Sequence, residues 1–459
     1  MRPARERDRD YATMTADRNT SSATEAEEDR TGLLKLAVAG LAVGALAGLF
    51  GCAFHLAVDY AVALRSAVVA WSLQGSWFAW LAPIGLAAAA AFVSRWLVRR
   101  FAPEASGSGV QHVEAVVQGE ARPVRAIVLP VKFIGGTLAL GSGLALGREG
   151  PTVQMGATLG RLFARSFGLR AADDRALLAA GAGAGLAAAF NAPLAGAIFV
   201  FEELVRRFEL RVAVAALTAC SAALALMRAL IGQRLEFSVP TFEMQLFPGY
   251  LLFLLFGGLV GLLGVAYNRL VVAGLDVAER MHRVAPEVQA ALVGGLFGLL
   301  ACVTPTLVGG GETLIQSVLD GGQSVAMLLI IFAARLVLGP LSYAPGLPGG
   351  LFAPLLVVGA AAGALFGHAL EAALPVLTAP TAAYAAVGMG ALFVGVVRAP
   401  VTGIALIVEM TGETALFIPL LTACAAAVAV PTLLGDPAIY DALRLRDAAR
   451  RREQGGGAP

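Results

Sequence analysis

Charged residues are scarce in this chain. Only 14% of its 459 residues are Asp, Glu, Lys or Arg, whereas 58% are hydrophobic and the mean hydropathy is +0.76. A soluble domain carries about 25% charged residues, so a fold surrounded by water is excluded. Several uncharged runs reach the length that spans a bilayer, such as residues 36–54, 78–93, 212–227 and 251–267. We therefore predict a multi-pass protein that lies in membrane lipid.

Cysteine and histidine are also rare, and neither is clustered. The four cysteines lie singly in apolar runs, which excludes a disulfide framework and a cysteine metal site. The four histidines share no metal spacing, and the His-Glu-x-x-His pattern of metalloproteases is absent. An intramembrane serine protease needs Gly-x-Ser-Gly, but the residues two positions before Ser108 and Ser142 are not glycine. We expect no enzyme activity, no metal and no cofactor.

The charges that are present lie at the termini and in loops. Residues 1–31 combine six arginines with eight acidic residues and lack the apolar segment of a signal peptide, so we expect a disordered, cytoplasmic tail. Residues 446–459 form a short second tail, also expected in the cytoplasm. Arginines follow two of the apolar runs, as the positive-inside rule requires of cytoplasmic loops. This distribution argues against nucleic-acid binding, and we expect the protein in a bacterial inner membrane.

The membrane region, residues 32–445, contains an internal repeat. Residues 181–203 align with 388–410, and six Gly, Ala, Pro and Glu residues pair at a constant offset of 207. Upstream, Pro151, Gly156 and Gly160 pair with their equivalents at an offset of 203. Small residues recur in any helical membrane protein, but that does not explain the acidic residue eleven positions after Asn191 and after Arg398. We predict two related halves, about 33–232 and 245–445, as in secondary transporters.

Three glycine-rich segments interrupt the apolar pattern, each just before a helix-like stretch: residues 106–114, 147–156 and 346–356. Glycine permits turns that expose several N–H groups, and the following helix offers a partially positive N-terminus. Such a site attracts an anion without a buried full charge, which would be costly in a membrane and would bind the anion too tightly. A fourth element, residues 436–444, predicts a helix that begins at Pro437 with Tyr440 in its first turn. These segments indicate transport of a small inorganic anion.

The order of these segments resembles the CLC family of chloride channels and proton/chloride antiporters. Gly-Arg-Glu-Gly-Pro at 147–151, followed by Thr-Val-Gln-Met-Gly and by AAFNAPLAGAIFVFEE at 188–203, carries the resemblance, which covers residues 33 to 445. It implies an all-α integral membrane protein of the bacterial type without C-terminal CBS domains. About eighteen tilted and re-entrant helices would form the two halves, which we expect to be inverted. The resemblance also implies a homodimer with one pathway in each subunit.

The resemblance implies where the anion binds. The family uses a serine hydroxyl, a tyrosine hydroxyl and main-chain N–H groups, which fall here on Ser108, on Tyr440 and on the amides of Leu351 and Phe352. Around the gate, the expected anion-binding residues also include Gly147, Arg148 and Gly150. Other interpretations stay open: Ser108 could instead cap the following helix, and Tyr440 could be an interfacial anchor.

Three carboxylates are expected to carry or support proton transfer. Glu149 matches the gating glutamate, which competes with the anion and swings out when protonated. Glu203 matches the internal glutamate that exchanges protons with the cytoplasm, and Glu202 is its supporting neighbour. Alternatively, Glu149 could pair with Arg148, and Glu203 with Arg206 or Arg207.

Two positions depart from the family. Gln111 stands where the family usually has a proline, and Tyr440 lies one residue further from its proline than in some relatives. Proline is favoured at a helix start, so Gln111 keeps the helix possible and adds an N–H donor near the anion.

We predict proton-coupled chloride transport, that is, H+/Cl− exchange. The alternative is a passive voltage- or pH-gated chloride channel of the same fold, but the family's channels usually lack an acid at the position of Glu203. A fluoride-selective protein is less favoured, since that branch departs at the serine segment. Ser108 favours chloride over nitrate, because some nitrate-selective relatives have proline there.

Overall fold

The computed structural model describes residues 4–167, 170–233, 235–241 and 248–455, and these residues form seventeen α-helices, five short helical segments and no β-strand. Eight of the described helices are long and apolar enough to cross a membrane, judged by length and composition. Three further apolar helices are shorter, with 10–17 residues. The prediction of an all-α, multi-pass protein is confirmed, with close to the expected number of helices.

The first half comprises eight helices. They are α1 (Ala4–Leu73), α2 (Leu81–Phe101), α3 (Val110–Val117), α4 (Val128–Gly141), α5 (Glu149–Ser166), α6 (Ala171–Phe190), α7 (Pro193–Phe199) and α8 (Leu210–Ile231). A π-helical turn, Val200–Val205, extends α7.

The second half repeats this order and adds a final helix. Its members are α9 (Pro248–Arg280), α10 (Pro286–Val303), α11 (Glu312–Leu319), α12 (Val325–Tyr343), α13 (Phe352–Ala373), α14 (Thr381–Val397), α15 (Pro400–Thr411), α16 (Phe417–Leu433) and α17 (Ile439–Gly455).

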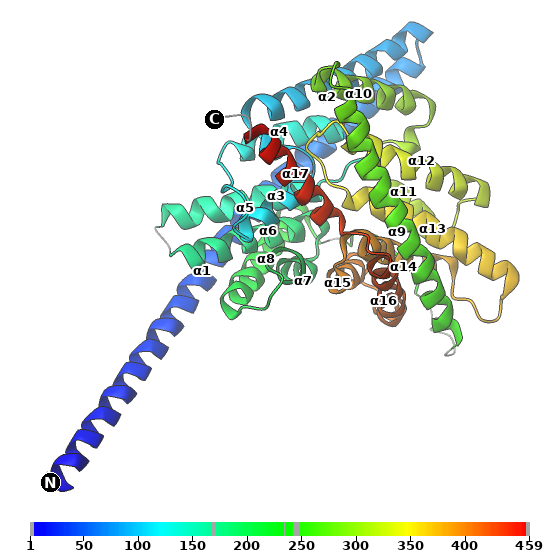
Figure 1. Ribbon diagram of the computed structural model, residues 1–459. Coiled ribbons are helices and arrows are strands. Elements are labelled where there is room, and N and C mark those ends of the chain that lie inside the picture. Colours follow the sequence, from blue (N-terminus) through cyan, green and yellow to red (C-terminus); the bar gives the residue numbers. More distant parts are fainter. Residues whose placement is uncertain (1–3, 168–169, 234, 242–247, 456–459) are drawn as a thin grey trace.

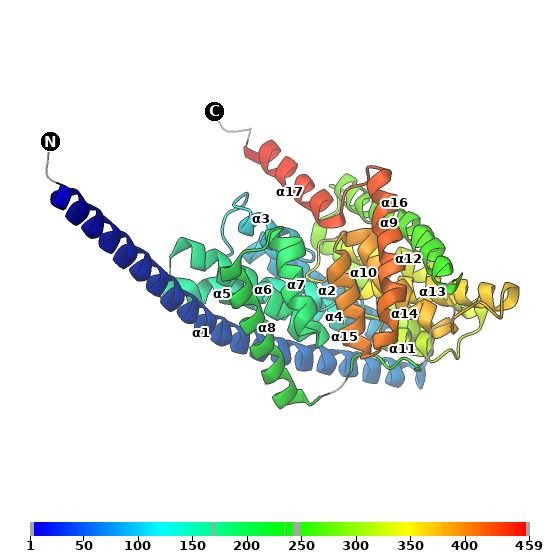
Figure 2. The ribbon, with the colours of Figure 1, turned by 90° about the horizontal axis from the view of Figure 1, so that it is seen from below.

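The described residues nearest to both termini are helical. Residues 4–31, expected to be disordered, continue α1, and the start of this helix projects away from the other helices (Figures 1 and 2). The segment from Ala4 to Thr31 contains neither glycine nor proline, so nothing in it terminates a helix. At the other end, α17 begins at Ile439, two residues later than predicted, and runs into the C-terminal tail.

The two halves repeat the same close helix contact. A Cβ atom on Gly156 of α5 would lie 2.1 Å from the carbonyl oxygen of Gly181 on α6. At the equivalent place in the second half, a Cβ on Gly359 of α13 would lie 2.3 Å from the carbonyl oxygen of Gly388 on α14. Only glycine permits this approach, so the repeated glycines have a packing function.

The halves are also inverted. Glu202 follows α7 and binds the start of α15, where its carboxylate accepts hydrogen bonds from Val401 N (2.9 Å) and Thr402 N (2.7 Å). In return, Glu409 near the end of α15 binds the start of α7 through Leu194 N and Ala195 N. Helices that each hold the other's first turn run antiparallel. The orientation that the sequence alone did not establish is therefore visible here.

Helices α6 and α14 are almost entirely buried in the part of the chain that the structure describes. Within α14, every residue from Ala383 to Val397 is buried. The outer helices expose apolar side chains instead: Leu251, Leu255 and Leu262 on α9 are each more than half exposed. This arrangement, apolar on the outside as well as inside, suits a surface that faces lipid. At the N-terminus of α13, every residue from Phe352 to Ala361 is buried, so this helix begins inside the protein.

Candidate functional site

The three glycine-rich segments predicted from the sequence meet at one place. Gly147, before α5, exchanges two backbone hydrogen bonds with Gly350, before α13 (2.9 and 2.8 Å). Gly349 N donates to the carbonyl oxygen of Gly107, before α3 (3.1 Å). Helix starts from both halves of the chain therefore converge, and their N–H groups lie close together.

Glu149 places its carboxylate on the N-terminus of α13. Its Oε1 accepts hydrogen bonds from Phe352 N (2.7 Å) and Ala353 N (3.4 Å), and the side chain is only 1% exposed. Its Oε2 has no hydrogen-bond partner among the described residues. A helix N-terminus is a natural anion site, so the carboxylate occupies the place that a free anion would take.

Glycine is required beside this carboxylate. A Cβ atom on Gly350 would lie 2.2 Å from Glu149 Oε1, and one on Gly147 would lie 2.0 Å from Oε2. Both distances are far shorter than a van der Waals contact. Gly147 and Gly350 therefore make room for the Glu149 carboxylate against the backbone.

Arg148 does not pair with Glu149. Its guanidinium binds Glu236 (2.5 Å), the Nδ1 atom of His55 (2.5 Å) and the carbonyl oxygen of Ala189 (3.1 Å). The alternative interpretation, an ion pair between Glu149 and Arg148, is therefore not observed.

Ser108 and Tyr440 bring two buried hydroxyls to the same region. Both residues are fully buried, and among the described residues neither hydroxyl has a hydrogen-bond partner of good geometry, although the two face each other. A Cβ on Gly150 would lie 2.7 Å from Ser108 Oγ, which places this hydroxyl against the start of α5. The Tyr440 ring lies 6.0 Å from that of Phe352. Buried hydroxyls normally have partners, so these two are available to a ligand.

The amides that reach the Glu149 carboxylate belong to Phe352 and Ala353. Leu351 is the buried residue that precedes α13. The two residues whose amides are expected to bind the anion, Leu351 and Phe352, therefore lie at this helix N-terminus, and their binding of an anion stays a prediction.

Glu203 lies in the π-helical turn after α7 and is 3% exposed. Its Oε1 has no hydrogen-bond partner, and its carboxylate forms no ion pair among the described residues. Arg206 instead pairs with Glu114 (2.8 Å) and with Asp441 of α17 (2.9 Å), while Arg207 pairs with Glu209. The alternative of an ion pair with Arg206 or Arg207 is therefore not observed. An unpaired buried carboxylate is a costly feature that indicates a function.

Glu202, next to it, points elsewhere. Its carboxylate binds the first turn of α15, including the hydroxyl of Thr402 (2.7 Å). This contact gives Glu202 a structural function. Its supporting role in proton transfer stays a prediction.

Sequence reasoning missed two buried charges near the site. Lys132 is fully buried in α4 and donates to the carbonyl oxygens of Ala105 (3.0 Å) and Gly107 (2.7 Å), just before Ser108. Glu114 is fully buried in α3 and pairs with Arg206. A single lysine within an apolar run is a recognisable signal, and Lys132 could have been found from it.

Three comparisons place this chain among known proteins. The family model described as "Voltage gated chloride channel" matches residues 89–432. A protein named H(+)/Cl(−) exchange transporter ClcA from Vibrio parahaemolyticus is 42% identical over 408 residues, which cover 87% of each chain. The protein of the same name from Cronobacter sakazakii is 40% identical and covers 93% of this chain.

Solved structures agree with the sequence comparisons. The structure of a slow cyanobacterial Cl−/H+ antiporter matches with a TM-score of 0.88 and 33% identity, covering 91% of this chain and 99% of its own. A CLC-type fluoride/proton antiporter matches with a TM-score of 0.72 at 22% identity, which is evidence for the fold alone.

Proposed function

We propose a transport mechanism for this chain, which belongs to the voltage-gated chloride channel family. The protein is a membrane transporter that exchanges chloride for protons. One observation carries the mechanism: the Glu149 carboxylate lies on the N-terminus of α13, where Phe352 N and Ala353 N would otherwise bind an anion.

Chloride and protons compete at this one place. When Glu149 is ionised, its carboxylate holds the amides at α13 and excludes chloride. Protonation removes the charge and weakens these charge-assisted hydrogen bonds, so the side chain leaves and chloride takes its place. Each proton taken up by Glu149 thus opens the site to an anion.

The hydroxyls of Ser108 and Tyr440 are assigned to the next step of the anion path. Both are buried without good partners, and a hydroxyl donates one hydrogen bond to chloride. Neutral donors hold an anion weakly enough to release it again, which transport requires.

Glu203 is assigned to the proton path. It lies near Asp441 and Arg206 on the side of the protein that carries α17, and Tyr440 lies within electrostatic range of both Glu203 and Glu149. A buried carboxylate without an ion pair can accept and release a proton. A passive channel has no use for it, and this favours exchange over the channel alternative.

The membrane arrangement remains part of the proposal. Arginines gather on the α17 side, near the ends of α2 and α7, so we assign this side and both termini to the cytoplasm of a bacterial inner membrane. We expect a homodimer. Helix α16 exposes Phe417, Ile418 and Leu421, which a second subunit or lipid would cover.

Flux measurements test the function directly. Purified protein is placed in liposomes with a high chloride concentration inside and the same pH on both sides. As chloride leaves, protons should move into the liposomes. Blocking the membrane potential with a potassium ionophore should not abolish this proton movement. Chloride flux without proton movement would instead support the channel.

A further inference from the structure

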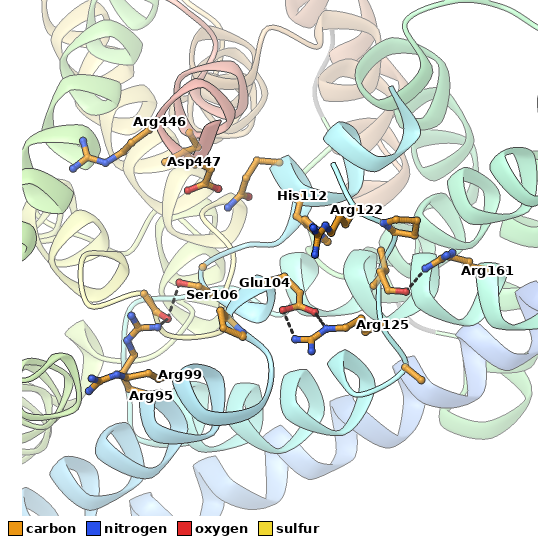
Figure 3. A pocket seen from close by; sticks show the side chains of 18 of the residues that line it. Arg95, Arg99, Glu104, Ser106, His112, Arg122, Arg125, Arg161, Arg446 and Asp447 are labelled. Carbon is orange, nitrogen blue, oxygen red and sulfur yellow. Dashed lines mark hydrogen bonds and ion pairs between the residues drawn. The ribbon is translucent and has the colours of Figure 1, made fainter. Parts of the chain in front are cut away.

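A large cavity opens beside the proposed anion path, on the side of the protein that carries α17 (Figure 3). Its volume is about 1310 Å3, and its walls come from the end of α2, the loops on both sides of α3, the end of α5 and α17. Gly107, Gln111 and Tyr343 line it, and Gly107 directly precedes Ser108. Tyr343 accepts a hydrogen bond from Ser108 N (3.2 Å). The cavity therefore borders the backbone that presents the Ser108 hydroxyl.

The cavity is strongly basic. Seven arginines line it, against two acidic residues, Glu104 and Asp447. Three of the arginines are already neutralised: Arg99 pairs with Glu287 (3.0 Å), Arg125 with Glu104 (2.5 Å), and Arg446 with Asp276 and Glu279. A fourth, Arg95, donates to the carbonyl oxygen of Gly346.

The remaining three arginines have no acidic ion-pair partner among the described residues. Arg122 and Arg165 are exposed, and Arg161 donates to the carbonyl oxygen of Val124. Arg161 and Arg165 lie one turn apart on α5, where like charges repel. Figure 3 places Arg122 and Arg161 at one end of the cavity, away from Arg95 and Arg99. Asp174 lies within electrostatic range of Arg161 but forms no ion pair with it among the described residues, so positive charge exceeds negative charge at this end.

The size of the cavity indicates a ligand larger than chloride. Its volume of about 1310 Å3 lies above the usual range of small-molecule sites, about 300–1,000 Å3. A single chloride would neither fill this space nor contact three separated guanidinium groups.

We propose that this cavity binds a multiply phosphorylated anion, held by Arg122, Arg161 and Arg165. The planar guanidinium group matches the geometry of phosphate oxygens and binds them through paired hydrogen bonds. The phosphates come from a soluble polyphosphate compound or from a lipid headgroup, since both present the same chemistry. A ligand seated against Gly107 and Gln111 closes the anion path from this side and inhibits transport. This last consequence rests on the proposed function, whereas binding does not.

Isothermal titration calorimetry tests binding. Sodium tripolyphosphate is titrated at low ionic strength into the purified full-length protein, in a detergent whose headgroup contains no phosphate. We expect one tripolyphosphate per chain. The double variant R122Q/R165Q should bind about tenfold or more weakly, as expected for two lost charge-assisted contacts. R100Q/R175Q removes the same charge from two exposed arginines outside the cavity and should bind like the unmodified protein. No binding, or equal weakening in both double variants, would overturn the proposal.

Two further experiments identify the source of the phosphate groups and the effect of their binding on chloride transport. Dioctanoyl phosphatidylinositol bisphosphate is titrated in the same way, and the tighter of the two probes indicates whether the phosphates belong to a lipid or to a soluble compound. In liposomes with tripolyphosphate on both sides, chloride flux should fall for the unmodified protein and for R100Q/R175Q but not for R122Q/R165Q. If tripolyphosphate binds but flux is unchanged in all three, the inhibitory part is wrong while the binding site stands. If the protein moves no protons at all, only the proposed exchange fails, because calorimetry does not depend on it.

Discussion

Glu202 and Glu409 hold each other's helices across the two halves of the chain. Each carboxylate accepts two backbone hydrogen bonds from the first turn of the helix in the opposite half, at 2.7 to 3.0 Å. The exchange is reciprocal because the two residues are repeat equivalents in inverted halves. Negative charge at a helix N-terminus is stabilising, so the pair joins the halves near Glu203.

Removing either carboxylate should therefore destabilise the protein by a similar amount. E202A and E409A each leave a helix start without its cap, which costs about 1 kcal/mol. Thermal unfolding in detergent, followed by tryptophan fluorescence, should show comparable decreases in the midpoint. The same variants separate the two roles of Glu202. If it only joins the halves, both variants keep the proton-to-chloride ratio, whereas a role in proton transfer predicts that only E202A changes it.

A methyl group at Gly350 should displace the gate. The Cβ atom would lie 2.2 Å from Glu149 Oε1, so the carboxylate cannot remain on the α13 amides. G350A should transport chloride with little dependence on pH and with a lower proton-to-chloride ratio. G258A on α9, where an added Cβ meets no atom within 4 Å, is the matched control and should behave as the unmodified protein. Normal coupling in G350A would show that the observed carboxylate position is not part of the transport cycle.

Ser108 is predicted to set the preference for chloride. S108A removes one hydroxyl donor, worth about 1 kcal/mol for a hydrogen bond, so chloride should bind about fivefold more weakly. S108P also removes the N–H that donates to Tyr343, and selectivity should move further toward nitrate. The ratio of chloride to nitrate flux in liposomes measures both effects. An unchanged ratio in both variants would assign selectivity to Gln111 or to the backbone amides.

Glu203 is predicted to be needed by protons and not by chloride. E203Q removes the titratable group from a buried position that has no ion pair among the described residues. Proton transport should stop while chloride transport continues, uncoupled. A purely structural residue would instead reduce both fluxes together and lower expression. Simultaneous recordings of chloride and proton flux decide, and a ratio equal to that of the unmodified protein would remove Glu203 from the proton path.

The site was predictable where its chemistry is local in sequence. Glu149 is recognisable because glycine and proline surround it in one short motif, and Tyr440 because it follows a proline at a helix start. Contacts between distant segments were not predictable in the same way. Nothing in the local sequence indicates that Glu202 binds Thr402, or that Arg206 pairs with Glu114 and Asp441 rather than with Glu203.

The fold shows the same division. The constant offset between the repeats predicts that equivalent residues pack in the same way. The contacts Gly156–Gly181 and Gly359–Gly388 confirm this. Whether the halves are inverted depends on how equivalent helices lie relative to each other in space. The antiparallel contact between α7 and α15 shows this. The arginine cavity was hidden for the same reason, since Arg122 and Arg165 lie on separate elements and neither carries a motif.

The central claim is that chloride and protons compete at Glu149. E149Q resembles the protonated side chain but cannot carry a proton. The most direct measurement is therefore proton movement by E149Q in liposomes on a fixed chloride gradient, recorded together with chloride flux at several pH values. For the unmodified protein we predict proton movement, and chloride flux that rises as pH falls, because protonation frees the α13 amides. For E149Q we predict chloride flux that persists at all pH values and no proton movement, whereas protons still driven uphill by E149Q would contradict the mechanism.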